Sequence, residues 1–266
     1  MVYVPLGSFY IGDGDGSSQS IGAFYQNVNT SVLIDNTLKQ SIKCGSTNFD
    51  DAQLTTTGIG IKGDAGLDTN NDGTIDNLNF PTGYNAFYMM KYEISQGQYR
   101  NFLNTLTRLQ QKAHVASNIA NDSPEGNPPH IFVMTNTSAM RYRNGIVCPS
   151  SGNGTTDSVV FSCDLNGTGT YNEAADGEWI ACGSLSWNDL SAYADWAALR
   201  PMTELEFEKA CRGTDPSVNR EYAWGSNDIT GTISLSAGTG GTTSERSGQS
   251  GHGLCNYENN AIGGPL

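Results

Sequence analysis

The sequence has few charged residues, and cationic ones are especially scarce. Only 15% of its 266 residues are charged, and 27 acidic against 14 basic side chains give a formal net charge of -13. The phosphates of nucleic acids and anionic membrane surfaces repel a chain this acidic. We therefore expect no nucleic-acid partner and regard a multivalent cation as the more natural one.

Long apolar runs are also missing. No stretch of the chain has the length and apolar character of a membrane span, so no membrane insertion is expected. The first five residues lack the basic and apolar regions of a signal peptide. The loops are nonetheless rich in the small polar turn residues typical of surface proteins. We expect an extracellular or cell-surface protein, of which this chain is a processed or internal segment.

Sequence motifs for common enzyme chemistries are absent as well. The chain contains no G-x-S-x-G, no H-E-x-x-H and no phosphate-binding glycine loop, and its three histidines are scattered. Its six cysteines form no C-x-x-C, so disulfides in an oxidising compartment are expected rather than a zinc site. Cys148 and Cys163 bracket a Gly/Ser/Thr-rich excursion and could pair locally. The pairing of the other four stays open.

Three segments carry helix caps. In each, a Ser or Thr is followed three residues later by Gln, Asp or Glu, the spacing of a capping box. These pairs are Ser95–Gln98, Ser186–Asp189 and Thr203–Glu206. Apolar residues recur behind them at helical spacing. The expected buried positions are Tyr99, Phe102, Leu103, Leu106 and Leu109 in the first helix, Leu190, Tyr193, Ala194 and Ala197 in the second, and Leu205 with Phe207 or Ala210 in the third.

Strands are expected between these helices and before them. Residues 2–11 indicate an edge strand with a bend, residues 84–92 a buried strand, and residues 131–147 a strand pair. The edge strand could also pair with a neighbouring subunit. The Arg200–Pro201 step should end the second helix. Trp187, Trp196 and Trp224 are expected to pack in the core.

Residues 68–76 have the alternating oxygen-bearing side chains of a calcium loop, with a glycine for the sharp turn. The predicted ligands are Asp68, Asn70, Asp72, Thr74 and Asp76. Residue 79 is Asn rather than the bidentate Glu of an EF-hand, so we predict a single-loop calcium site. The alternative is a solvated Asp/Asn turn.

A second stretch repeats this alternation with fewer charges. Its oxygen-bearing side chains are those of Asp164, Asn166, Thr168 and Thr170. The same reasoning makes it a weaker calcium loop.

Residues 184–225 carry the most specific pattern in the chain. Two capped helices joined by a short turn are followed by Tyr-x-Trp-Gly. This stretch resembles the core of the formylglycine-generating enzyme, or sulfatase-modifying factor, domain family. The matching positions are Ser186, Trp187, Asp189, Ala192, Tyr193, Trp196, Ala197, Arg200, Pro201, Thr203, Glu204, Glu206, Glu208, Ala210, Arg212, Gly213, Tyr222, Trp224 and Gly225.

The resemblance implies an α+β fold of irregular, C-type-lectin-like type, with few helices, short antiparallel strands, long loops and structural calcium. It extends over residues 1–10, 87–106 and 182–256. We therefore expect a single domain over residues 1–266, with insertions at about 12–82 and 148–178. Asn256 falls at a calcium position of the family.

Active members of the family oxidise a cysteine of a sulfatase peptide to formylglycine. They use a copper ion held by two closely spaced cysteines near the C-terminal end of the domain. The nearest cysteines here, Cys148 and Cys163, are well separated in sequence, and the chain stops at Leu266. We therefore expect the C-terminal third of the family domain and its catalytic cysteine pair to be lacking.

These observations favour a non-catalytic, calcium-stabilised extracellular module. It would be a structural or interaction protein, such as a self-assembling subunit of a bacterial surface layer or filament. Its partners would be copies of itself, other surface proteins or glycans. Two alternatives stay open: a fragment of a formylglycine-generating, copper-dependent oxidase, and a lectin-like ligand-binding domain.

Overall fold

The computed structural model describes residues 1–12, 24–25, 32–36, 43–44, 77, 79–116, 119, 130–149, 158–216, 218, 221–222, 224–251 and 253–255. Few helices and short, mostly antiparallel strands make it an α+β protein, as expected. The chain divides into two compact units, Met1–Lys91 with Met202–Asp228, and Tyr92–Pro201 with Ile229–Leu266. No described helix has the length and apolar character of a membrane span.

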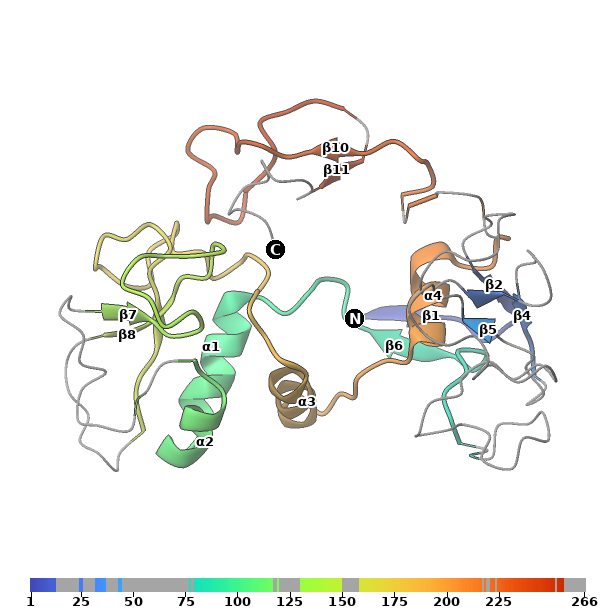
Figure 1. Ribbon diagram of the computed structural model, residues 1–266, viewed down its shortest axis with the longest axis horizontal. Helices are drawn as coiled ribbons and strands as arrows, with labels where there is room; N and C mark the ends of the chain where they lie inside the picture. Colours follow the sequence, from blue (N-terminus) through green and yellow to red (C-terminus); the bar gives the residue numbers. More distant parts are fainter. Residues whose placement is uncertain are drawn as a thin grey trace. The chain divides into compact units, whose positions relative to one another are not determined.

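The first unit is built from two-stranded antiparallel sheets and one helix (Figure 1). The pairs are β1 (Val2–Val4) with β6 (Phe87–Met89), β2 (Phe9–Ile11) with β4 (Val32–Ile34), and β3 (Phe24–Tyr25) with β5 (Lys43–Cys44). The predicted bend lies between β1 and β2, where Gly7 N donates to Tyr84 O at 3.0 Å. The predicted strand at 84–92 forms only as the shorter β6, and its expected burial is wrong, because Tyr88 is exposed and its neighbours are half-buried.

Helix α4 (Glu204–Arg212) completes this unit. Its Leu205 packs in a small core with Phe9, Ile11 and Ile34, whereas Phe207 is exposed. The cap at its start forms as predicted, with Glu206 N donating to Thr203 Oγ1 at 3.2 Å.

The same helix buries a cation that the sequence does not mark. Lys209 is only 3% exposed. Its Nζ donates to Gly83 O at 2.7 Å, to Gly7 O at 3.1 Å and to Tyr84 O at 3.4 Å. These carbonyls belong to the turns beside β2 and β6, so one side chain bridges three acceptors, of which Gly83 O is buried.

The second unit contains helices α1 (Gln96–Thr105), α2 (Arg108–Ala113) and α3 (Trp187–Trp196). The predicted capping boxes at Ser95 and Ser186 both form. The expected continuation of the first helix to Leu109 is wrong. Leu106 is extended, and Thr107 caps α2 as a separate helix. Leu109 therefore lies 79% exposed.

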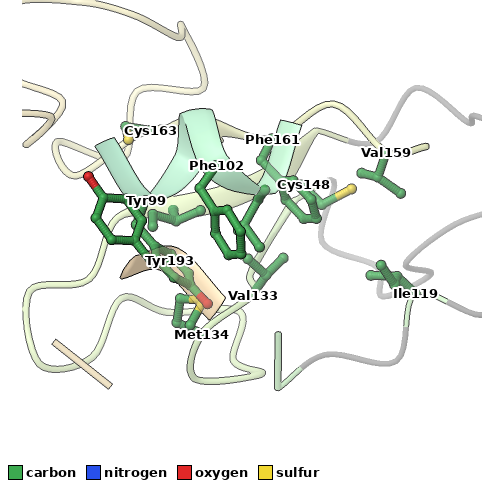
Figure 2. Packing of buried hydrophobic residues seen from close by; sticks show 12 residues of the cluster. Tyr99, Phe102, Ile119, Val133, Met134, Cys148, Val159, Phe161, Cys163 and Tyr193 are labelled. Carbon is green, nitrogen blue, oxygen red and sulfur yellow. The ribbon is translucent and has the colours of Figure 1, made fainter. Parts of the chain in front are cut away.

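The sheet of this unit confirms the predicted strand pair. Its antiparallel strands follow the order β7 (His130–Phe132), β8 (Ile146–Pro149) and β9 (Ser162–Cys163), while β10 (Thr230–Gly231) and β11 (Leu254–Cys255) pair in parallel elsewhere. Figure 2 shows the core beside the sheet, in which Tyr99 and Phe102 of α1 meet Tyr193 of α3. This core joins the helices to the strands.

The tryptophans are a clear departure from expectation, because they do not fill the core. Trp187 is 67% exposed, and Trp196 and Trp224 are also exposed. On α3, Tyr193 and Ala194 are buried, Leu190 is exposed, and Trp196 contacts the rings of Phe102 and Tyr193 while staying partly in solvent. Trp224 stacks on Tyr222 with ring centroids 4.7 Å apart.

Helix α3 also ends earlier than predicted. Its last helical residue is Trp196, and Ala198 adopts a positive φ of 55°. The short turn that follows runs on to Pro201. The proline therefore lies beyond the helix end instead of defining it.

Candidate functional site

A polar network crosses the helical part of the second unit. Nδ1 of His114, which follows α2, lies 2.9 Å from Asp189 Oδ1 in the first turn of α3. Oη of Tyr99 donates to His114 O at 3.1 Å, and Ser186 Oγ donates to Asp189 Oδ2 at 2.7 Å. The network therefore connects all three helices through side chains that face inward.

The protonation states of the network follow from its geometry. Burial opposes ionisation of Asp189, but the hydrogen bonds from His114 and Ser186 outweigh it and hold its pKa below the usual range. Since Asp189 is ionised at neutral pH, Nδ1 of His114 must be the donor. Burial and the charge of Asp189 raise the pKa of Tyr99, which stays a neutral phenol.

This arrangement can stabilise the fold, but it exposes no reactive group. The side chains of His114 and Asp189 are only 16% and 10% exposed. The Ser186 hydroxyl donates to Asp189 and accepts from its backbone N–H, so it is engaged in the helix cap. We interpret the network as a structural connection between helices.

Of the thiols in this unit, those of Cys148 and Cys163 are buried and that of Cys182 is half-buried. Burial raises the pKa of Cys163 and of Cys182 to about 12, and that of Cys148 to about 11. Asn144 Nδ2 approaches Cys182 Sγ at 3.7 Å. These cysteines therefore remain protonated at neutral pH, although metal ligation and nucleophilic attack both require the thiolate.

The predicted local disulfide between Cys148 and Cys163 is not formed, because Cys163 is a thiol in this structure. Its partner across the strand pair is Ile146. Figure 2 shows the sulfur atoms of Cys148 and Cys163 well apart in the core cluster.

Copper, which the family resemblance implies, was tested against these cysteines. A thiolate copper site needs two soft ligands that converge on one ion. Cys163 is buried and Cys182 half-buried, and they lie close enough for their charges to interact, but burial raises the pKa of both thiols. Cys211 lies on α4 and Cys255 in β11. Within the described ranges, no three side chains of the metal-binding types converge. The described residues therefore do not fit a copper–thiolate centre.

The predicted calcium ligands divide into two groups. Asp68, Asn70, Asp72, Thr74, Asp76 and Asn256 lie outside the described residues. The second loop is described, and Asp164 organises it. Asp164 Oδ1 accepts from Thr168 N at 3.0 Å, and Oδ2 accepts from Gly169 N at 3.1 Å. Asn166 Oδ1 also accepts from Thr168 N, and the carbonyl of Thr170 accepts from Thr168 Oγ1 at 3.4 Å.

Two acidic residues that the sequence analysis did not include join this loop. Glu173 Oε2 accepts from Thr168 Oγ1 at 2.7 Å and from Asn166 Nδ2 at 3.1 Å. Asp176 Oδ2 accepts from Glu173 N at 2.7 Å. The sequence signal that could have identified them is an acidic residue nine positions after Asp164 and another twelve positions after it.

The described parts thus define an α+β protein with short strands, capped helices and a buried polar network. The chain belongs to the Sulfatase-modifying factor enzyme 1-like domain family, which matches residues 59–263, more than half of its length. The formylglycine-generating enzyme of Streptomyces coelicolor is 54% identical over 41 residues, which cover 15% of this chain and 12% of that protein. No solved structure matches the chain.

These findings confirm the resemblance and overturn the main functional prediction. A non-catalytic, calcium-stabilised structural module was expected, but the chain belongs to a family named for an enzyme. The expectation gave most weight to the missing cysteine pair, although the family match extends over most of the chain. The oxidase alternative agrees better with these findings.

Proposed function

We propose that this chain serves in a formylglycine-generating oxidase, which converts a cysteine of a sulfatase-type polypeptide to formylglycine. The observation that carries the proposal is the family match over residues 59–263. The Streptomyces enzyme adds a short segment of high identity. Because that segment covers a small share of the relative, the activity and the substrate are inferences from the family.

The finer fold assignment belongs to the same proposal. We infer the irregular, C-type-lectin-like architecture of the family from its membership and from the capped helices α3 and α4. Ser186 and Thr203 form their capping boxes at the positions where the family pattern has them. These caps fix where each helix begins, and the buried Leu205 and Tyr193 anchor the helices in their separate cores.

In this proposal the described residues act as scaffold. The thiols of Cys163 and Cys182 are assigned to packing, because Cys163 lies in the core cluster and Cys182 packs against it.

A direct assay tests the activity. The full chain is incubated in air with copper, a thiol reductant and a cysteine-containing sulfatase peptide. An aldehyde-specific probe and mass spectrometry should detect formylglycine at the cysteine, and a peptide with Ser in place of that cysteine should stay unchanged. Folded protein that yields no aldehyde in the presence of copper would overturn the proposal.

Two variants test the scaffold assignment separately. Cys163→Ala and Cys182→Ala should retain aldehyde formation, with a loss no larger than their loss of folded protein. If either variant stays folded by circular dichroism yet forms no product, its thiol takes part in the chemistry and the assignment is wrong.

A further inference from the structure

The loop at residues 164–178 buries negative charge with little compensation. Asp164 and Asp176 are both fully buried. Glu173 and Glu178 lie close enough for their charges to act on Asp176. Arg100 forms an ion pair with Glu178 and also donates to Asn172 Oδ1 at 3.1 Å. The positive charge of Arg100 therefore lies at the outer part of the cluster, beside Glu178 and Asn172.

One carboxylate oxygen in the cluster lacks a hydrogen-bond partner. Asp176 Oδ2 accepts from Glu173 N, but Oδ1 is buried and has none. A buried polar atom left without a partner costs about 1–3 kcal/mol, and more when it is charged. Burial, together with the charges of Asp164 and Glu173, raises the pKa of Asp176. The orphaned oxygen therefore marks a place where a positive ligand would be stabilising.

The surrounding donors are of the kind that hard cations prefer. Asp164, Asn166, Thr168 and the carbonyl of Thr170 occupy alternate positions, and Glu173 is hydrogen-bonded to two of them. All of these atoms are oxygens, which suit calcium. Gly169, at the sixth position, has a φ of +75°, as the sharp turn of a calcium loop requires.

We propose that residues 164–176 bind one divalent cation of the calcium class, with Asp164, Glu173 and Asp176 as its carboxylate ligands. In the described structure three such side chains do not yet converge. Binding must therefore break the hydrogen bonds that Thr168 and Asn166 make to Glu173. Calcium is favoured over magnesium, because it accepts more oxygens and tolerates irregular geometry. The inference does not depend on the proposed function.

Hydrogen exchange of the full chain locates the site without mutation. Exchange is compared in calcium, in magnesium and in a chelator, and peptides covering residues 164–178 are followed separately from those covering 64–79. At a calcium concentration ten times the dissociation constant, opening of residues 164–178 should slow about tenfold. Magnesium should slow it much less. If calcium has no effect on residues 164–178, or acts only on 64–79, the proposal is overturned.

Matched variants assign the ligand. Asp176→Asn should abolish the calcium response of residues 164–178, whereas Asp72→Asn, in the other predicted loop, should leave that response intact. If Asp176→Asn keeps the full calcium response, Asp176 is not a ligand and the proposed site is wrong. The wild-type exchange experiment decides the matter even if the variant folds poorly.

Discussion

His114 Nδ1 lies 2.9 Å from Asp189 Oδ1, so the end of α2 is connected directly to the first turn of α3. The two residues are far apart in the sequence, and both side chains are largely buried. Phe102 packs edge-on against the His114 ring, with centroids 5.6 Å apart. The pair therefore lies against the aromatic core of its unit and should contribute to its stability.

Replacement of His114 by Ala should destabilise the second unit. It would leave the ionised Asp189 without its main partner in a poorly solvated position, where breaking a buried pair costs about 3 kcal/mol. Urea unfolding followed by circular dichroism measures the loss. Asp195→Asn, at an exposed position of the same helix, is the control and should change stability by less than about 0.5 kcal/mol. Equal effects of the two substitutions would contradict a stabilising pair.

The same pair predicts how stability depends on pH. The pKa of Asp189 is lower in the folded chain than its ordinary value of 3.8. The unfolded chain therefore takes up this proton first, and the stabilisation is complete above pH 3.8 and lost as the pH falls through the folded pKa. Unfolding midpoints in urea between about pH 2 and pH 6 should show this loss. In Asp189→Asn that contribution should vanish, and an unchanged acid dependence would refute the assignment.

Replacement of Lys209 by Met should destabilise the first unit. The apolar stem still fits, but the carbonyls of Gly7, Gly83 and Tyr84 lose their common donor. Gly83 O is buried, whereas Tyr84 O still accepts from Gly7 N, so we expect a loss of about 1–3 kcal/mol, the cost of one buried acceptor without a partner. Lys112→Met, at an exposed position of α2, is the control and should be nearly neutral. Thermal unfolding of both variants measures the loss. A small effect of Lys209→Met on the unfolding midpoint would contradict the bridging role of Lys209.

Local features could be predicted from the sequence, because their causes lie within a few residues. A Ser or Thr three positions before Gln, Asp or Glu favours a helix cap where apolar residues follow at helical spacing, and all three predicted boxes form. Even so, the first helix is two helices, because Thr107 and Gln110 form a further capping box that overrides the apolar spacing.

Features that depend on distant parts of the chain could not be predicted in this way. No feature of the neighbouring sequence shows that Lys209 contacts the turns at Gly7 and Gly83. The tryptophans were assigned to the core because of their size, yet burial is decided by which helix face meets the sheet. Asp176 joins the Asp164 loop only through the fold of the intervening residues.

Gly241 should tolerate no side chain. It has a φ of +73°, and a Cβ there would lie 2.3 Å from the carbonyl oxygen of Ala175. Gly238 has nearly the same φ, +72°, with nothing within 4 Å. Gly238→Ala should therefore show backbone strain alone, about 1 kcal/mol. Gly241→Ala adds the displacement of residue 175, about 1–3 kcal/mol more. Equal unfolding free energies for the two variants would contradict this close packing.

The cysteines should differ in reactivity according to their burial. Cys163 and Cys182 have pKa values of about 12, against an ordinary 9.0, so they should react with iodoacetamide about a thousandfold more slowly than free cysteine. Cys211 is exposed on α4, although burial and Glu208 raise its pKa, and it should be labelled before the other two. Timed labelling at pH 8 with peptide mass spectrometry follows each site.

Unfolding supplies the control for this last prediction. In denaturant without a reductant, Cys163, Cys182 and Cys211 should all be labelled at similar rates, because burial alone protects the first two. If Cys163 or Cys182 still resists labelling in the unfolded chain, it is oxidised in the protein. That result would support the predicted disulfides, but with a different pairing. If Cys163 reacts as fast as Cys211 in the folded chain, the core around β9 is more open than its packing indicates.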